Sequence, residues 1–152
     1  MKTTKFKKVL IAIDYDETSQ IVAEKGFSIA KALDSELVIL HVVSEQPVYY
    51  SSYTYMRELR VDFFEDLKKS TQDFLDKTKK HLGDETIQTI LKEGDIADTI
   101  LNTAKEMKAD LIVMGSHGRK WLENIIMGSQ VEDVFKNTTL PLFIVPTRKK
   151  EE

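Results

Sequence analysis

Five short apolar runs alternate with segments of helical spacing, and this alternation restricts the fold more than any other feature of the chain. The runs cover residues 9–13, 37–43, 86–91, 111–114 and 142–145. The first, second and fourth are almost continuously apolar, as expected for strands that are covered on both faces. The third is more polar and the fifth is bracketed by Pro141 and Pro146, so we expect both at the edges of a sheet.

Four helices are expected between these strands, because apolar residues recur there every three or four positions. Thr18 or Ser19 is expected to cap the first helix, and Asp95 the third. The order β-α-β-α-β-α-β-α-β predicts an α/β fold, with an open five-stranded parallel sheet, right-handed crossovers and helices on both faces. The expected inner faces are Val22, Ile29, Ala30 and Leu33; Val61, Phe64, Leu67, Thr71, Phe74, Leu75 and Leu82; Ile96, Ile100, Ala104 and Met107; and Val131, Val134 and Phe135.

Length and composition exclude several classes of protein. The 152 residues suit one domain, which we place at residues 1–147 before a charged tail at 148–152. There is no cysteine, which excludes disulfides, a thiolate nucleophile and Cys-ligated zinc. The formal charge of -3 is spread over mixed signs, so no nucleic-acid partner is expected. The first apolar run is too short for a signal peptide or a membrane span, and we expect a soluble cytoplasmic protein.

The segment after the fourth run has the composition of a phosphate-binding loop. In open parallel sheets, ligands bind beyond the carboxyl ends of the strands. Gly115 and Gly118 would let the backbone approach a ligand and adopt positive φ. Gly128 and Ser129 open a helix whose N–H groups and dipole favour an anion, and Arg119 with Lys120 adds positive charge. The alternative is that the first two glycines only shape a tight turn.

The glycine pattern becomes specific when the rest of the chain is considered with it. Gly-x2-Gly-x9-Gly-Ser, following a strand and opening a helix, resembles the nucleotide-binding signature of the universal stress protein family. The likeness extends to residues 9–14, 40–43, 110–118 and 141–146. It implies a flavodoxin-like fold, also called adenine nucleotide hydrolase-like, with strand order 3-2-1-4-5.

The resemblance also implies roles for individual residues, all of them in binding an adenine nucleotide, ATP or AMP. Asp14 would hold the ribose, the Val42 backbone would pair with the adenine edge, and Gly115 would pack against the ribose beside Met114. Phosphates would be contacted by Gly118, Arg119, Gly128 and Ser129, with backbone N–H groups of Gln130 and Val131. Mg²⁺ would be carried by the phosphates, and the sequence offers no protein cage for a metal.

Some features depart from the pattern or remain open. Asp16 and Glu17 are extra acids near the expected site, which either weaken triphosphate binding or turn outward. Gln130 stands where a small or branched residue is more usual. His41 is interpreted as a strand residue satisfied by local hydrogen bonds. The loop over residues 44–55 holds four tyrosines and is either a surface loop or a lid or partner contact.

The favoured function is a nucleotide-binding stress-response regulator with an unknown protein partner. One alternative is a nucleotide-free dimerising adaptor of the same fold. Another is a slow ATPase or self-phosphorylating protein, although no convincing general base is visible. A homodimer through the last strand is expected, because its edge leaves backbone groups unpaired, with Leu142, Phe143, Ile144 and Val145 at the interface.

Overall fold

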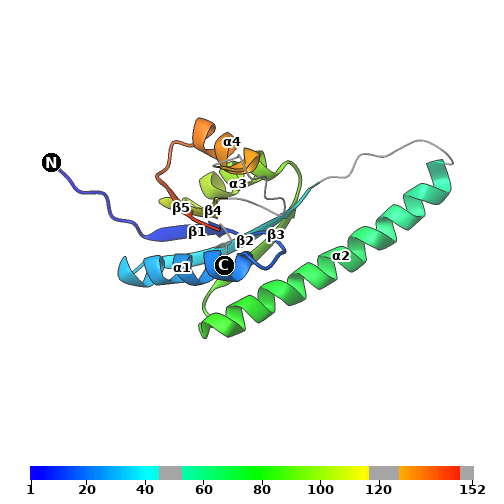
Figure 1. The fold of residues 1–152 in the computed structure, drawn as a ribbon, viewed down its shortest axis with the longest axis horizontal. Helices are drawn as coiled ribbons and strands as arrows, with labels where there is room; N and C mark the ends of the chain where they lie inside the picture. The colour runs from blue at the N-terminus through cyan, green and yellow to red at the C-terminus, as the bar shows by residue number, and fades with distance from the viewer. Residues whose placement is uncertain (45–52, 117–126, 148–152) are drawn as a thin grey trace, which may run out of the picture.

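The computed structural model describes residues 1–44, 53–116 and 127–147, without the side chains of residues 53–64. Strands and helices alternate throughout, as predicted (Figure 1). The strands are β1 (Lys8–Ala12), β2 (Glu36–Val43), β3 (Gln88–Glu93), β4 (Leu111–Gly115) and β5 (Leu142–Val145). The helices are α1 (Ser19–Ala32), α2 (Tyr53–Leu82), α3 (Ile96–Glu106) and α4 (Ser129–Asn137).

The five strands form one parallel sheet in the order β3-β2-β1-β4-β5, which confirms the expected topology. The polar run and the proline-bracketed run are the edge strands β3 and β5, as predicted. In the centre, Ala12 of β1 lies opposite Leu40 of β2 on one side and Met114 of β4 on the other. The chain changes direction across the sheet between β1 and β4, so a crevice is expected at the carboxyl ends of these strands.

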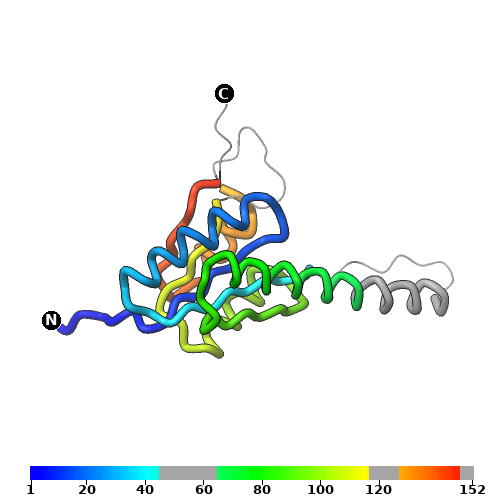
Figure 2. The backbone as a smooth tube through the Cα atoms, turned by 90° about the horizontal axis from the view of Figure 1, so that it is seen from below, coloured from blue at the N-terminus to red at the C-terminus, as the bar shows by residue number. Residues whose placement is uncertain are grey.

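Helices cover both faces of the sheet, and each face has its own apolar core. Helices α1 and α2 lie on one side and α3 and α4 on the other (Figure 1); seen from below, α1 and the described part of α2 lie in front of the strands (Figure 2). Alternate strand residues serve the two cores, with Ile11 in the first and Leu10 in the second. At Gly26, α1 approaches β1 so closely that an added Cβ would lie 2.7 Å from Ile11 Cγ1 and closer still to Cδ1.

The N-terminus of α1 is built differently from the expectation. Thr18 occupies the N-cap position, but its side chain makes no capping hydrogen bond. Instead Asp16 Oδ1 accepts from the Thr18 N–H at 2.8 Å, the Thr18 hydroxyl at 2.6 Å and the Ser19 N–H at 3.2 Å. A carboxylate two residues earlier therefore supplies the cap, because the turn brings it back over the first N–H groups. The Asp95 cap of α3 is confirmed, with its side chain accepting from Asp98 N–H at 3.0 Å.

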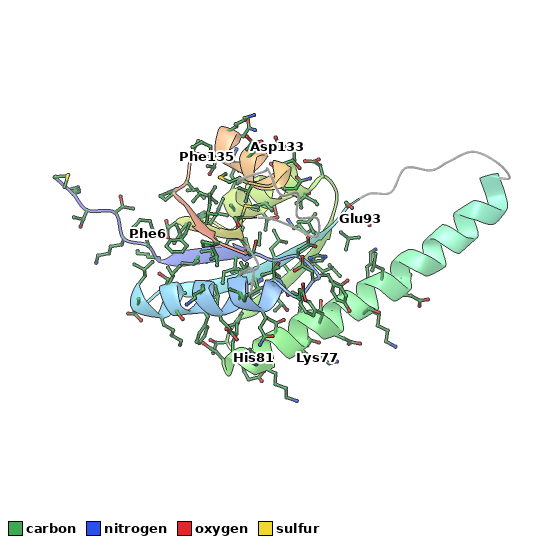
Figure 3. The ribbon with its side chains drawn as sticks, in the orientation of Figure 1. Phe6, Lys77, His81, Glu93, Asp133 and Phe135 are labelled. Atoms are coloured by element: carbon green, nitrogen blue, oxygen red, sulfur yellow. The ribbon has the colours of Figure 1, made fainter. Side chains whose placement is uncertain are left out.

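Three expectations about helix boundaries and faces were wrong. Helix α2 begins at Tyr53, so Tyr53 and Tyr55 belong to a helix and not to the loop expected over 44–55; residues 45–52 lie outside the described part. Leu33 is the C-cap of α1 and is 40% exposed, because it follows the last turn that packs on the sheet. Phe135 is 64% exposed (Figure 3), since α4 buries only Val131 and Val134.

The strand expected at a dimer interface is largely occupied by the protein's own core. Val145 is buried in the first core cluster, and Leu142 and Ile144 pack against the second. Phe143 remains 45% exposed. A second copy pairing with this strand would therefore meet the β5 backbone, the Phe143 ring and the exposed parts of Leu142 and Ile144. The homodimer interface itself stays a prediction.

Candidate functional site

A cavity of about 500 Å³ lies at the carboxyl edge of the sheet, where the chain leaves β1, β2 and β4. Its volume is within the range of roughly 300–1,000 Å³ typical of small-molecule sites. Every described residue predicted for the nucleotide lines it, namely Asp14, Val42, Met114, Gly115, Gly128, Ser129, Gln130 and Val131. Gly118 and Arg119 lie outside the described residues, as does the rest of the segment 117–126.

The turn after β1 presents one of its three acids to the cavity. Asp14 lines the wall, and its Oδ1 accepts from the Tyr15 N–H at 2.8 Å. Asp16 is held at the start of α1 by the hydrogen bonds described above, and Glu17 is exposed. Among the described residues, neither Asp16 nor Glu17 lines the cavity. Of the two interpretations of these acids, the structure favours the one in which they turn away from the site.

The end of β2 offers an open backbone edge to the cavity. Leu40 C=O accepts from Ile13 N–H at 2.9 Å, and Val43 C=O accepts from Gly94 N–H at 3.0 Å, so alternate residues of β2 face β1 and β3. Val42 faces the β1 side, beyond the point where β1 ends. Within the described part of the chain, no hydrogen bond joins the Val42 N–H or C=O to the segment after β1. A donor and an acceptor of one residue therefore point together toward the site.

The glycines of the loop have different backbone conformations from those expected. Gly115 is the last residue of β4, paired with Val145 in the sheet. Gly128 has φ -67° and ψ 156°, which is extended backbone that any residue adopts. The expectation of positive φ is therefore wrong for Gly115, and Gly128 does not need it either. What both positions contribute to the cavity wall is backbone without a side chain.

Ser116 joins the two ends of the glycine loop. Its C=O accepts from the Gly128 N–H at 2.8 Å, and its N–H donates to Val145 C=O at 2.9 Å. Its side-chain Oγ accepts from the Thr147 N–H at 3.0 Å, and both residues are buried. Ser116 and Gly128, which lie at the two ends of the glycine loop, are therefore hydrogen-bonded to each other. Sequence reasoning missed this role, because nothing in the sequence showed that the Ser116 side chain turns inward.

The start of α4 faces the same cavity. Ser129, Gln130 and Val131 form its first turn and line the wall, and Gly128 at the N-cap has no side chain to occupy their N–H groups. First-turn N–H groups have no partner within a helix, and the helix dipole favours an anion there. This end of the cavity suits a phosphate, and the phosphate site stays a prediction. Glu132 is the acidic residue of that turn.

The remaining walls come from helices that sequence reasoning did not assign to the site. Helix α2 contributes Leu67 and Thr71, and α3 contributes Ile96 and Ile100. These residues were expected on inner helix faces, but their position along the sheet depends on how each helix docks. Tyr15 lies between α2 and β2, with its ring centroid 4.7 Å from that of Phe74 and 6.5 Å from that of His41.

These groups can bind a ligand with a heterocyclic edge at one end and an anion at the other. Among the described residues, no group of three or more His, Cys, Asp or Glu side chains could hold a metal ion. No helix in the described part of the chain is long and apolar enough to cross a membrane.

Known proteins share this sequence pattern and fold. The model of the "Universal stress protein family" matches residues 5–146. Universal stress protein MJ0531 of Methanocaldococcus jannaschii is 36% identical over 96% of this chain and 85% of its own length. Universal stress protein YxiE of Bacillus subtilis is 36% identical over 92% of this chain and 99% of its own length.

Solved structures agree with the topology. MJ0577 is similar with a TM-score of 0.79 and 27% identity, over 97% of this chain and 100% of that chain. Two more distant structures share the fold, each with a TM-score of 0.62. One is a universal stress protein in complex with cAMP, at 21% identity over 95% of this chain and 100% of that chain. The other is a universal stress protein from Archaeoglobus fulgidus in complex with dAMP, at 17% identity over 93% of this chain and 98% of that chain.

Proposed function

Because the chain belongs to the universal stress protein family, we propose that it binds an adenine nucleotide, ATP or AMP, and acts as a nucleotide-dependent regulator. The observation that carries this proposal is the cavity at the strand-order reversal, with the open Val42 edge at one end and the start of α4 at the other. A purine base and a phosphate require these two kinds of group. The two more distant structures hold ligands that share the adenine base.

In the proposed complex the base lies against Val42, whose C=O accepts from the N6 amino group and whose N–H donates to a ring nitrogen. The Asp14 carboxylate accepts from the ribose hydroxyls, beside Gly115 and Met114. The phosphates lie at the N-terminus of α4, against the N–H groups of the first turn and the Ser129 hydroxyl. Gly118 and Arg119 complete the phosphate site in this proposal, and Mg²⁺ is carried by the phosphates.

Binding would change what the surface presents, because the glycine loop starts and ends at one fixed base. Ser116, at one end of the loop, donates to Val145 C=O of β5 and accepts from the N–H of Gly128 at the other end. A phosphate bound by the loop and the start of α4 would stabilise the loop and so alter the face that a protein partner meets. The proposed function is therefore regulatory. Any hydrolysis of ATP is expected to be slow.

The first test is identification of nucleotide released by denaturing the freshly purified protein, followed by thermal unfolding with added ATP and Mg²⁺. A ligand that binds only the folded state stabilises it by mass action, by about 2.7 kcal/mol at a hundred times Kd. We expect Tm to rise with ATP. An unchanged Tm at millimolar ATP and the absence of any copurified nucleotide would overturn the proposal and favour the nucleotide-free adaptor.

Two substitutions test whether the ligand binds within the cavity. Gly128→Val should lower ATP affinity at least about tenfold, or 1.4 kcal/mol, because a branched Cβ enters the phosphate site while φ -67° accommodates the residue. Asp14→Asn should weaken binding of the ribose. Asp34→Asn is the matched control, since Asp34 follows α1 with φ 54°, which Asn tolerates, and Asp34 is not among the residues lining the cavity. Equal affinities in all three variants would place the nucleotide elsewhere.

A further inference from the structure

We propose that His41 is a positioning residue for base recognition. Its ring nitrogen donates to the carbonyl oxygen that would otherwise accept a hydrogen bond from the Val42 N–H. The proposal rests on the proposed adenine-nucleotide function. It adds a residue that determines specificity without touching the ligand. The last hydrogen bonds between β1 and β2 show what the ring replaces.

The parallel ladder between β1 and β2 ends one hydrogen bond early. Ile13 N–H donates to Leu40 C=O at 2.9 Å, and the next bond of a regular parallel ladder would run from Val42 N–H to Ile13 C=O. These two described residues do not form that bond. His41 Nδ1 lies 2.8 Å from the Ile13 carbonyl oxygen instead. A carbonyl oxygen only accepts, so Nδ1 carries the proton and the side chain replaces the backbone donor.

The His41 ring is fixed where it makes this bond. His41 is 5% exposed. It lies two residues after Ile39 of the first core, so its side chain is on the same face of the sheet, which α1 and α2 cover. The Tyr15 ring lies beside it, with 6.5 Å between centroids. Val42, the next residue, has its side chain in the second core. The ring therefore reaches the carbonyl that follows β1 from one face of the sheet, while the backbone N–H and C=O of Val42 remain open to the cavity.

Removing the donor would change the backbone pairing. Ile13 is 5% exposed, and a buried carbonyl without a donor is unfavourable. The Val42 N–H is the donor that the regular ladder would supply. Without the His41 N–H, we expect the Val42 N–H to form the next hydrogen bond of the ladder. The Val42 N–H would then no longer be available to bind the adenine base. The ring thus preserves a donor and an acceptor that point together at the adenine base.

The test compares His41→Phe, which keeps a ring without a donor, with His41→Asn, whose amide nitrogen branches from the same position as Nδ1. In the nucleotide-free protein, hydrogen exchange at the Val42 amide, followed by NMR, reports the pairing directly. We expect exchange to slow at least about tenfold in His41→Phe relative to wild type, because the amide gains a partner. His41→Asn should restore exchange toward the wild-type rate.

The second measurement is the ratio of affinities for ATP and inosine triphosphate, which share ribose and phosphates but have donor and acceptor reversed at the N1 edge of the base. We expect wild type to prefer ATP by about tenfold or more, His41→Phe to lose most of this preference, and His41→Asn to recover it. A loss of protein stability alone would weaken the binding of both nucleotides equally.

The outcomes separate this inference from the proposed function. Fast exchange at Val42 in His41→Phe, or an unchanged ATP preference in that variant, would overturn the positioning role while leaving nucleotide binding intact. Failure of wild type to bind either nucleotide would overturn the proposed function and, with it, the role of His41 in recognition. The exchange measurement would still decide whether His41 holds the Val42 edge open.

Discussion

At the scale of single residues, Gly26 shows how one missing side chain sets the distance between a helix and the sheet. A Cβ at this position would lie 2.7 Å from Ile11 Cγ1, and Ile11 is fully buried. We expect Gly26→Ala to lower the free energy of unfolding by about 1–2 kcal/mol, because overpacking costs about 1–3 kcal/mol and the better helix propensity of Ala offsets up to about 1 kcal/mol. Urea denaturation measures this difference.

The control for Gly26 is a double-mutant cycle with Ile11→Val, which removes the Cδ1 atom nearest to the added methyl group. Ile11→Val alone should cost about 0.5–1.5 kcal/mol. The combined variant should be less destabilised than the sum of the two single variants, since the shorter side chain relieves the overlap. Strict additivity would show that α1 moves away from β1 instead, and would contradict the argument.

At the scale of elements, α1 is held to the C-terminal end of α2 and the turn beyond it by charged contacts. Glu24 of α1 accepts from His81 Nε2 of α2 at 2.8 Å, and this hydrogen bond, with a second from Gln20, lowers the pKa of Glu24. Hydrogen bonds from the Thr86 hydroxyl and N–H lower the pKa of Asp84, and Lys31 of α1 lies 3.3 Å from the same carboxylate.

A lowered pKa in the folded state makes these contacts depend on pH in a known direction. Their stabilisation is present above the unfolded-state pKa values and is lost as the pH falls through the folded-state values, below about pH 4. We therefore expect Asp84→Asn to be less stable than wild type at neutral pH and to approach wild-type stability at pH 3. Urea denaturation between about pH 3 and pH 7 measures this.

Asp73→Asn is the comparison for Asp84→Asn, because Asp73 is an exposed carboxylate on α2. This variant should follow the pH dependence of wild type. A constant difference between Asp84→Asn and wild type across the whole pH range would mean that ionisation of Asp84 does not contribute to holding α1 against the end of α2.

At the scale of the whole molecule, the β5 edge of the sheet is the surface proposed for a homodimer. β5 pairs with β4 on one side, and Phe143 is 45% exposed on this strand. A two-fold axis along the edge would pair the outward-facing backbone groups of β5 in two copies and cover both Phe143 rings. We expect a dimer at micromolar concentration by sedimentation or light scattering, and a monomer for Phe143→Asp.

Phe135→Asp is the matched control for the dimer, since Phe135 is also an exposed phenylalanine but lies on α4 (Figure 3). It should leave the dimer intact. Ile144→Asp is a poorer probe, because Ile144 packs against the second core of its own chain. A monomeric wild-type protein, or a dimer that both aspartate variants leave unchanged, would exclude this interface.

The order of elements and the edges of the sheet could be predicted from the sequence, because the hydrophobic pattern of each strand reflects how far it is buried. The runs over 9–13, 37–43 and 111–114 are apolar on both faces and form the central strands, while the polar and proline-bracketed runs form the edges. The Asp95 cap and the start of α4 at Ser129 were also predictable, since both depend on neighbours within one turn.

Only the tertiary structure decided which groups remain available for a ligand and which are used by the fold. Asp14 lines the cavity, whereas Asp16 hydrogen-bonds the start of α1, and the contribution of Leu67 and Thr71 to the cavity depends on how α2 docks. The open edge of Val42 exists because a side chain from the neighbouring position meets a carbonyl 28 residues away in sequence. Such pairings are long-range competitions for one hydrogen-bond partner, and the local sequence pattern does not determine which competitor wins.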